Sequence, residues 1–236
     1  MLEKLKRTVL EANLELVKNG LVTMTWGNVS GIARSEGLIV IKPSGVEYRK
    51  MTVKDMVVVD LAGDVVEGKR RPSSDTPTHV ELYKSFESIG GIAHCHSECA
   101  TSFAQAGKEL PCFGTTHADV FHGGVPVTRL LSKDEVEGQY ELNTAKVILE
   151  RFKDLDPLAI PGVLVTGHAP FAWGVDPLDA VHNSVVLERV ASMALRSLAL
   201  NPWLSPLPNY IVEKHYQRKH GPKAYYGQPK DKKKKS

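Results

Sequence analysis

The chain has 236 residues, of which 42% are hydrophobic and 24% are charged. These values are typical of a globular protein and exclude the fibrous and intrinsically disordered classes. The length suits one domain whose core needs no disulfide or metal staples. We therefore expect a single domain over residues 1–228.

The formal net charge of +3 comes from the C-terminal end of the chain. Residues 230–236 hold five of the 30 basic and one of the 27 acidic residues, so the rest carries 25 and 26. A nearly neutral body without a basic stripe excludes nucleic acid as a partner. The Lys-rich segment 229–236 is predicted to be a solvated tail outside the domain.

The cysteines and the apolar runs indicate the compartment. Cys95, Cys99 and Cys112 are odd in number and lack a framework spacing, which argues against a secreted disulfide scaffold and for a reducing compartment. The N-terminus shows no signal-peptide pattern, and no apolar run reaches the roughly 20 residues that span a bilayer. We expect a cytoplasmic protein that has no membrane partner.

Apolar periodicity and capping residues predict an alternation of helices and short strands. Helices are expected at 2–18, from Pro77 to about Phe86, at 98–106, at 132–152 behind the capping box Ser132-x-x-Glu135, and from Asp176-Pro177 to about Leu200. Strands are expected at 38–41, 56–61 and 125–127, in the segment opened by Gly90-Gly91, and on both sides of a glycine turn in 161–174.

The pair His94 and His96 is the first candidate for chemistry. On a strand, alternate side chains share a face, so both imidazoles are expected on one side with Cys95 on the other. Two imidazoles on a rigid strand make half of a divalent metal site. Two independently hydrogen-bonded histidines explain the pair equally well. His168, at the glycine turn, would complete a three-histidine set.

Two turns carry groups that suit an anion. Lys42-Pro43-Ser44-Gly45 offers a charge, a hydroxyl and free backbone N–H groups. Ser73, Ser74 and Asp75 stand where a helix begins, and helix N-termini favour anions. Either turn alone is explained by ordinary turn or N-cap chemistry. Together they favour a phosphate pocket.

Three further segments carry polar groups. The turn Trp26-Gly27-Asn28 suggests a close approach of backbone, although on this fragment alone an ordinary β-bulge is the preferred explanation. A loop is expected to deliver His117 and Asp119. The segment 215–228 is dense in titratable and phenolic groups, which indicates that it docks onto a site, in this subunit or in a neighbouring one.

Taken in order, these motifs resemble the class II aldolase/adducin family over residues 1–228. The resemblance rests on Trp26–Ser30, Lys42–Gly45, Ser73–His79, His94-Cys-His96, Thr115–Asp119, Gly167–Gly174 and the segment from Arg218 to Gln228. It implies an α/β fold of three layers, in which a central, mostly antiparallel mixed sheet is flanked by helices.

The resemblance also implies roles for individual residues. It places His94, His96, His168 and the acidic Asp75 at a divalent metal, with Zn²⁺ as the first choice and Mn²⁺ or Co²⁺ as alternatives. It places an acid/base pair, Asp119 and Tyr226, across a subunit interface of a homotetramer. Residues expected to hold the substrate phosphate are Gly27, Asn28, Ser44, Gly45, Ser73 and Ser74, and supporting residues are Lys42, Thr115, Glu141, His215 and Arg218.

The activity implied is that of the family's epimerases, which interconvert L-ribulose 5-phosphate and D-xylulose 5-phosphate. C4 of these sugars carries no acidic proton, so inversion there requires cleavage and re-formation of the C3–C4 bond, with a metal acting as Lewis acid. In the related aldolases the position that resembles Asp75 is a glutamate. The aspartate found here therefore favours the epimerase. The alternatives are an aldolase that cleaves a ketose 1-phosphate, of L-fuculose or L-rhamnulose type, and a non-catalytic adducin-like binding domain.

Overall fold

The computed structural model describes residues 2–226, so the predicted tail 229–236 lies outside the described residues. Within this range, one seven-stranded sheet has the order β4-β3-β2-β1-β5-β7-β6. Every neighbouring pair is antiparallel. The strands are β1 (Asn28–Ala33), β2 (Leu38–Ile41), β3 (Val57–Asp60), β4 (Val65–Glu67), β5 (Gly91–His94), β6 (Gly162–Leu164) and β7 (Pro170–Gly174).

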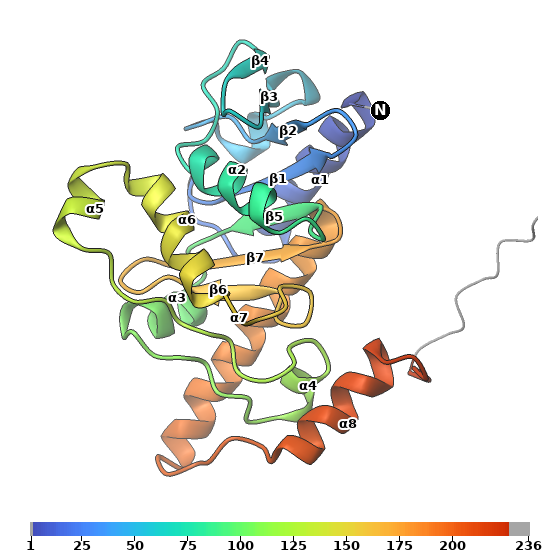
Figure 1. Ribbon diagram of the computed structural model, residues 1–236, viewed down its shortest axis with the longest axis vertical. Coiled ribbons are helices and arrows are strands. Elements are labelled where there is room, and N and C mark those ends of the chain that lie inside the picture. Colours follow the sequence, from blue (N-terminus) through green and yellow to red (C-terminus); the bar gives the residue numbers. More distant parts are fainter. Residues whose placement is uncertain (1, 227–236) are drawn as a thin grey trace, which may run out of the picture.

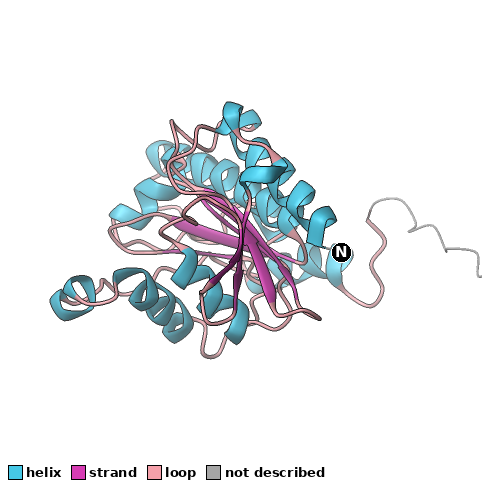
Figure 2. Cartoon of the chain, turned by 90° about the horizontal axis from the view of Figure 1, so that it is seen from above, coloured by secondary structure: helices cyan, strands magenta, loops and turns pink. Residues whose placement is uncertain are grey.

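Helices cover both faces of this sheet and give the expected three layers (Figures 1 and 2). Two short 3₁₀ turns, η1 (Tyr48–Lys50) and η2 (Val53–Asp55), connect β2 to β3. The helices are α1 (Leu2–Lys18), α2 (Thr76–Ser85), α3 (Glu98–Gln105), α4 (Thr115–Ala118), α5 (Lys133–Glu137), α6 (Tyr140–Arg151), α7 (Pro177–Leu200) and α8 (Asn209–His220). None of these helices is long and apolar enough to cross a bilayer.

The alternation of side chains along the strands divides the core between the two faces. Val40 and Val58 pack in one cluster with Val9 of α1. Their neighbours Ile39 and Val57 belong to the larger cluster on the other face, which also contains the apolar residues of α2. Because successive strand residues point to opposite faces, short all-apolar strands such as β2 fill both layers at once.

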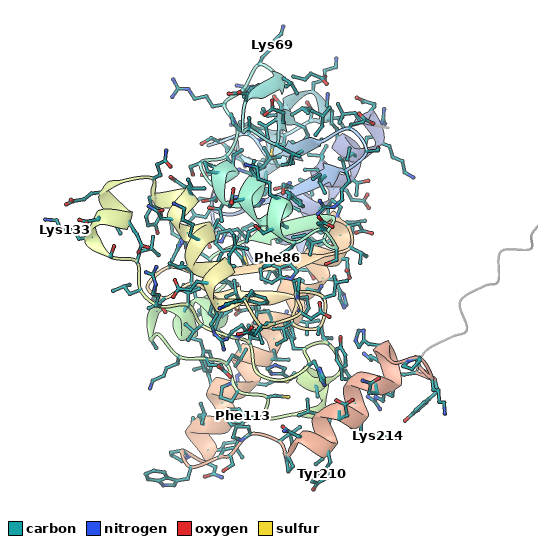
Figure 3. The ribbon with its side chains drawn as sticks, viewed as in Figure 1. Lys69, Phe86, Phe113, Lys133, Tyr210 and Lys214 are labelled. Carbon is teal, nitrogen blue, oxygen red and sulfur yellow. The ribbon has the colours of Figure 1, made fainter. Side chains whose placement is uncertain are left out.

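An aromatic group stands at the centre of the larger cluster. The rings of Phe86, Phe152 and Trp173 have centroids 5.0–5.7 Å apart in tilted and edge-on arrangements, and Figure 3 shows Phe86 in the middle of the molecule. The Trp173 indole N–H donates to the carbonyl oxygen of Pro157 at 2.7 Å. The buried indole therefore keeps a hydrogen-bond partner while contributing its full apolar area.

Gly91 is required where β5 passes under the start of α7. A Cβ at this position would overlap the backbone carbonyl of Asp176 and the nitrogen of Pro177, and backbone cannot swing aside. We expect Gly91→Ala to lower the free energy of unfolding by about 3 kcal/mol, the upper range for overpacking. Thermal melts test this, with Gly114→Ala as the control because an added Cβ meets nothing there. Equal midpoints for the two variants would contradict the expectation.

Most predicted elements are found within one or two residues, but several differ. The sheet is not mixed, since parallel pairing among the described residues is limited to the bridge between Val127 and Leu164. The strand expected at 125–127 makes only isolated bridges. The helix expected at 132–152 is two helices, because Gly138 leaves the helical conformation (ψ −123°) and ends α5.

Two segments near the candidate site also differ from the prediction. Residues Thr115–Ala118 form the short helix α4 rather than a loop, and Asp119 is its C-cap residue, whose N–H donates to the Thr115 carbonyl at 2.9 Å. Four residues are too few for an apolar period to show, and the turn packs against α7 and α8. β5 ends at His94, its last paired residue, so His96 lies beyond the strand.

Candidate active site

Three histidines meet at one end of the central strands. His94 closes β5, His96 follows it toward α3, and His168 lies in the turn between β6 and β7. Their ring centroids are 4.9–5.1 Å apart, and one ring nitrogen from each lies within 4.8 Å of the others. This spacing allows the three imidazoles to share one metal ion.

The surroundings of the histidines fit a metal. The carbonyl oxygen of Pro170 lies 2.9 Å from Nδ1 of His94, and since a carbonyl only accepts, Nδ1 carries the proton and Nε2 keeps its lone pair. The Phe171 ring stacks on His94 with centroids 4.1 Å apart. Nδ1 of His168 is buried and has no hydrogen-bond partner. The ring orientations are thus held by protein contacts while nitrogen lone pairs remain free.

Desolvation keeps the imidazoles of His96 and His168 in the neutral form that binds metals. It lowers the pKa of His168 to about 4, helped by the neighbouring His94 and His96. Partial desolvation of its ring likewise lowers the pKa of His96, although the residue as a whole is exposed. A neutral imidazole presents a lone pair, so these rings are ready ligands at neutral pH.

Asp75 lies beside the three histidines in the same pocket. Its carboxylate accepts a hydrogen bond from the Asn28 side-chain amide at 2.5 Å. Burial opposes ionisation, but the nearby His94 and His79 and this hydrogen bond hold the pKa of Asp75 below its usual value. Within residues 2–226, the group of ligand atoms close enough to share an ion contains the three histidines and not Asp75.

Two loops that carry serines also line the histidine pocket. The Ser44 N–H donates to the Arg71 carbonyl at 2.9 Å, and the Ser73 N–H donates to the Lys42 carbonyl at 3.0 Å. These bonds join loops that are thirty residues apart in sequence. The two serine-containing turns, which are predicted to bind an anion, therefore lie together in one wall of the pocket.

Lys42 supplies the positive charge of this wall. The residue is 2% exposed, and its ammonium nitrogen lies 4.8 Å from the centroid of the Tyr48 ring. Burial lowers the pKa of Lys42 to about 8, while the charge of Asp75 acts in the opposite direction. The ammonium form thus predominates at neutral pH; it donates to the carbonyl oxygens of Thr25 and Pro43 at 3.4 and 3.3 Å and has no carboxylate partner within the described residues, so it suits a phosphate.

Gly27 allows the closest approach of the turn to the metal site. Its φ is +80°, and an added Cβ would lie 2.7 Å from the backbone oxygen of His94. Both facts require glycine. The close approach of backbone suggested by the sequence is therefore found, and it sets Asn28 beside Asp75.

The pocket has a volume of about 550 Å³ and gathers twelve of the predicted site residues. Trp26, Tyr140 and Thr25 also line it and were not predicted as site residues. In the sequence, Trp26 opens the motif Trp26–Ser30, Thr25 precedes it, and Tyr140 precedes Glu141. The predicted residues that line the pocket are Gly27, Asn28, Lys42, Ser44, Gly45, Ser73, Ser74, Asp75, His94, His96, Glu141 and His168.

A second cluster forms around Asp119, at the end of α4. Arg218 of α8 donates from Nε to Oδ1 at 2.9 Å and from Nη2 to Oδ2 at 2.6 Å, and Nδ1 of His215 lies 3.1 Å from Oδ1. Burial opposes ionisation of Asp119, but these hydrogen bonds and the charge of Lys219 hold its pKa below the usual value. Asp119 is therefore a carboxylate at neutral pH.

Tyr226 joins this second cluster. Its ring centroid lies 4.6 Å from the guanidinium carbon of Arg218 and 4.7 Å from the Lys219 ammonium. Five of the predicted site residues do not line the histidine pocket of the described chain: Thr115, Asp119, His215, Arg218 and Tyr226. Helices α4 and α8 lie at the lower end of the molecule in Figure 1, with β3 and β4 at the other end. One chain thus holds two separate groups of candidate residues.

Two buried histidines outside the triad predict sensitivity to acid. Burial lowers the pKa of His79 to about 3 and that of His117 to about 4. The unfolded chain takes up these protons near pH 6.5 whereas the folded chain does not, so stability falls as the pH drops below 6.5. We expect a loss of about 2 kcal/mol per histidine at pH 5. Urea unfolding at pH 7 and pH 5 measures it, and equal midpoints would contradict it.

The sequence of residues 7–195 matches the family described as Class II Aldolase and Adducin N-terminal domain. The chain belongs to the class II aldolase and adducin family. Curated relatives include the L-ribulose-5-phosphate 4-epimerases UlaF of Salmonella paratyphi A and of Salmonella typhi. Each is 58% identical over 227 residues, which cover 96% of this chain and 100% of the relative.

Solved structures of the class II aldolase family share the fold. An L-fuculose 1-phosphate aldolase superposes with a TM-score of 0.77 at 26% identity, over 91% of this chain and 95% of the other. L-fuculose 1-phosphate aldolase from Glaciozyma antarctica superposes with a TM-score of 0.74 at 19% identity, over 92% and 81%. The expected three-layer fold and the expected family are therefore confirmed.

Proposed function

We propose that this class II aldolase-family chain is an epimerase that interconverts L-ribulose 5-phosphate and D-xylulose 5-phosphate at C4. The observation that carries the proposal is one pocket in which three imidazoles face two serine-containing loops and Lys42. Such a pocket suits a sugar with polar oxygens at one end and a phosphate at the other. The 58% identity to the UlaF epimerases over nearly the whole chain supports the same substrate.

The loops would act on the phosphate and leave the reacting carbons free. Ser44, Ser73 and Ser74 offer hydroxyl groups and Lys42 offers a desolvated charge. Anchoring the phosphate keeps the two-carbon aldehyde fragment in place after the C3–C4 bond breaks, while it turns to present its other face. A divalent metal held by His94, His96 and His168 would supply Lewis-acid stabilisation of the negative charge that cleavage leaves on the three-carbon fragment.

Asp119 and Tyr226 are proposed to move the proton of the C4 hydroxyl on the two faces of the aldehyde. A carboxylate and a phenol suit these opposite tasks because one accepts and the other donates. In one chain they lie together around Arg218 and away from the histidine pocket. We propose that a neighbouring subunit brings them to the pocket, in a homotetramer with active sites between subunits.

Zn²⁺ is the proposed metal, with Mn²⁺ and Co²⁺ as alternatives. Three neutral nitrogen donors with room for oxygen ligands suit Zn²⁺. Elemental analysis of the purified protein tests the choice.

We propose a cytoplasmic location for the enzyme. Cys95, Cys99 and Cys112 are all free thiols, which suits a reducing compartment. A phosphorylated sugar substrate is consistent with the same place.

The deciding experiment is incubation of the metal-loaded protein with L-ribulose 5-phosphate, followed by detection of D-xylulose 5-phosphate. Its appearance supports the epimerase. The fold shared with an L-fuculose 1-phosphate aldolase favours a second candidate, an aldolase acting on a ketose 1-phosphate. Cleavage of L-fuculose 1-phosphate without epimerisation would support that candidate. A protein inert toward both sugars would support a binding domain.

A further inference from the structure

Trp26 is a large aromatic side chain at the rim of the histidine pocket for which the proposed reaction has given no role. Its ring centroid lies 6.2 Å from that of His96, and the residue is 53% exposed. The other walls of the pocket are mostly hydroxyl, amide, carboxyl and imidazole groups. An exposed indole in such a polar site has a contact surface that only a bound molecule or a partner chain would cover.

The backbone of Trp26 is held in place although its ring is exposed. The Tyr48 hydroxyl donates to the carbonyl oxygens of Trp26 and Gly27 at 2.9 and 2.8 Å. The Trp26 N–H donates to the Thr23 carbonyl at 3.1 Å. Two anchors at consecutive carbonyls fix the direction in which the indole leaves the turn, so its position over the pocket is built into the fold.

Trp26 also separates the histidine pocket from a second cavity of about 560 Å³. Trp26 and its neighbour Thr25 line both cavities, whereas Met24, two residues before Trp26, lines only the second. Truncation of the indole would therefore remove part of the wall that the two cavities share.

The proposed reaction needs a wall of this kind. Breaking the C3–C4 bond of L-ribulose 5-phosphate moves the C4 hydroxyl proton to a base and the bonding pair to C3, and leaves glycolaldehyde phosphate. If this aldehyde escapes, C3 takes up a proton and dihydroxyacetone is released. A wall that forms directional hydrogen bonds would fix one orientation of the aldehyde, whereas the face of an indole allows rotation and still excludes water.

We propose that Trp26 contacts the aldehyde fragment and retains it during its rotation, so that cleavage ends in epimerisation rather than release. This inference rests on the proposed function. The inference predicts that loss of the indole raises one ratio, the amount of glycolaldehyde phosphate released divided by the amount of D-xylulose 5-phosphate formed. A residue that only supports the fold would change both yields together and leave their ratio constant.

The experiment compares wild type with Trp26→Ala, Trp26→Phe and Met24→Ala, starting from L-ribulose 5-phosphate. Products are counted by ³¹P NMR. We expect the ratio to rise about tenfold in Trp26→Ala, the change that loss of one aromatic contact brings. Trp26→Phe keeps an apolar face and should restore most of the wild-type ratio. Met24→Ala, on the same turn but outside the pocket, should match wild type.

Binding gives a second readout that needs no turnover. The chain has three tryptophans, and Trp173 is fully buried. We expect 2-phosphoglycolate, a mimic of the fragment, to change the fluorescence of wild type and not that of Trp26→Phe.

Any other outcome would overturn either the role of Trp26 or the proposed function. An unchanged ratio in Trp26→Ala, in a wild type that epimerises, would overturn the role of Trp26 and leave the proposed function standing. A wild type that forms no D-xylulose 5-phosphate would overturn the proposed function itself. Dissociation of Trp26→Ala into monomers at an unchanged ratio would assign the indole to a subunit contact instead, and would also overturn its role at the fragment.

Discussion

A His96→Asn variant is expected to lose bound metal and epimerase activity together. His94 and His168 cannot hold the ion alone with comparable affinity, because two nitrogen ligands leave the coordination sphere mostly to water. Without Lewis-acid stabilisation, worth several kcal/mol, we expect turnover to fall by at least about a thousandfold. His96 is exposed, so its replacement should leave the fold intact. Elemental analysis, the epimerase assay and a thermal melt measure the three quantities.

The matched control for this variant is His122→Asn. His122 follows α4 in the chain, and its Nε2 lies 2.6 Å from a carboxylate oxygen of Glu213 on α8. It does not line the histidine pocket. It should keep metal and activity. Full metal content in His96→Asn would show that the triad is not the site of the ion.

The variants Asp119→Asn and Tyr226→Phe are expected to lose turnover while keeping their metal. Proton transfer by a positioned side chain contributes about 10²- to 10⁴-fold to a rate. Neither residue lines the pocket that contains His94, His96 and His168 in its own chain, so metal content should stay at the wild-type level. Asn preserves the size of Asp119 but neither accepts a proton nor carries charge opposite Arg218. Steady-state kinetics and elemental analysis on the same samples test both statements.

Glu213→Gln is the control on α8, since Glu213 pairs with His122 and not with Asp119. It should leave turnover near the wild-type value. Mixed assemblies of His96→Asn and Tyr226→Phe chains provide a further check. If one subunit completes the pocket of another, some sites contain two intact halves and activity partly returns. Metal loss in Asp119→Asn or in Tyr226→Phe would show that the role proposed for that residue is wrong.

Local sequence signals predicted the elements whose causes are local. The predictions of a helix at 2–18 and of a helix after Asp176 were correct. Each segment has apolar residues at helical spacing over a long stretch, and a clear start or end signal. Asp176 accepts from the N–H groups of Leu178 and Asp179 at 2.9 Å, as an N-cap does. The capping box of Ser132 with Glu135 is likewise present. The helix 115–118 was missed because its stabilising contacts come from α7 and α8, distant in sequence.

The candidate site shows the same division more sharply. The kinds of residue that meet in the pocket were readable from their motifs, because imidazoles, serine turns and a glycine turn each have a chemistry of their own. The role proposed for Trp26 could not be predicted from the sequence. The residues around Gly27 do not distinguish an indole that lines a pocket from one that is buried in a core. The separation of Asp119 and Tyr226 from the histidines within one chain was implied by the family resemblance, which places this pair across a subunit interface, and not by any local pattern.

The sequence by itself determined the family, the short-range elements and which side chains carry chemistry, because these depend on neighbours along the chain. Only the tertiary structure decided which of them meet. The loops at Ser44 and Ser73 come together through backbone hydrogen bonds between distant segments, and Asp119 is held by Arg218 nearly a hundred residues later. Such contacts depend on how strands pair and helices dock, and no local pattern encodes those distances.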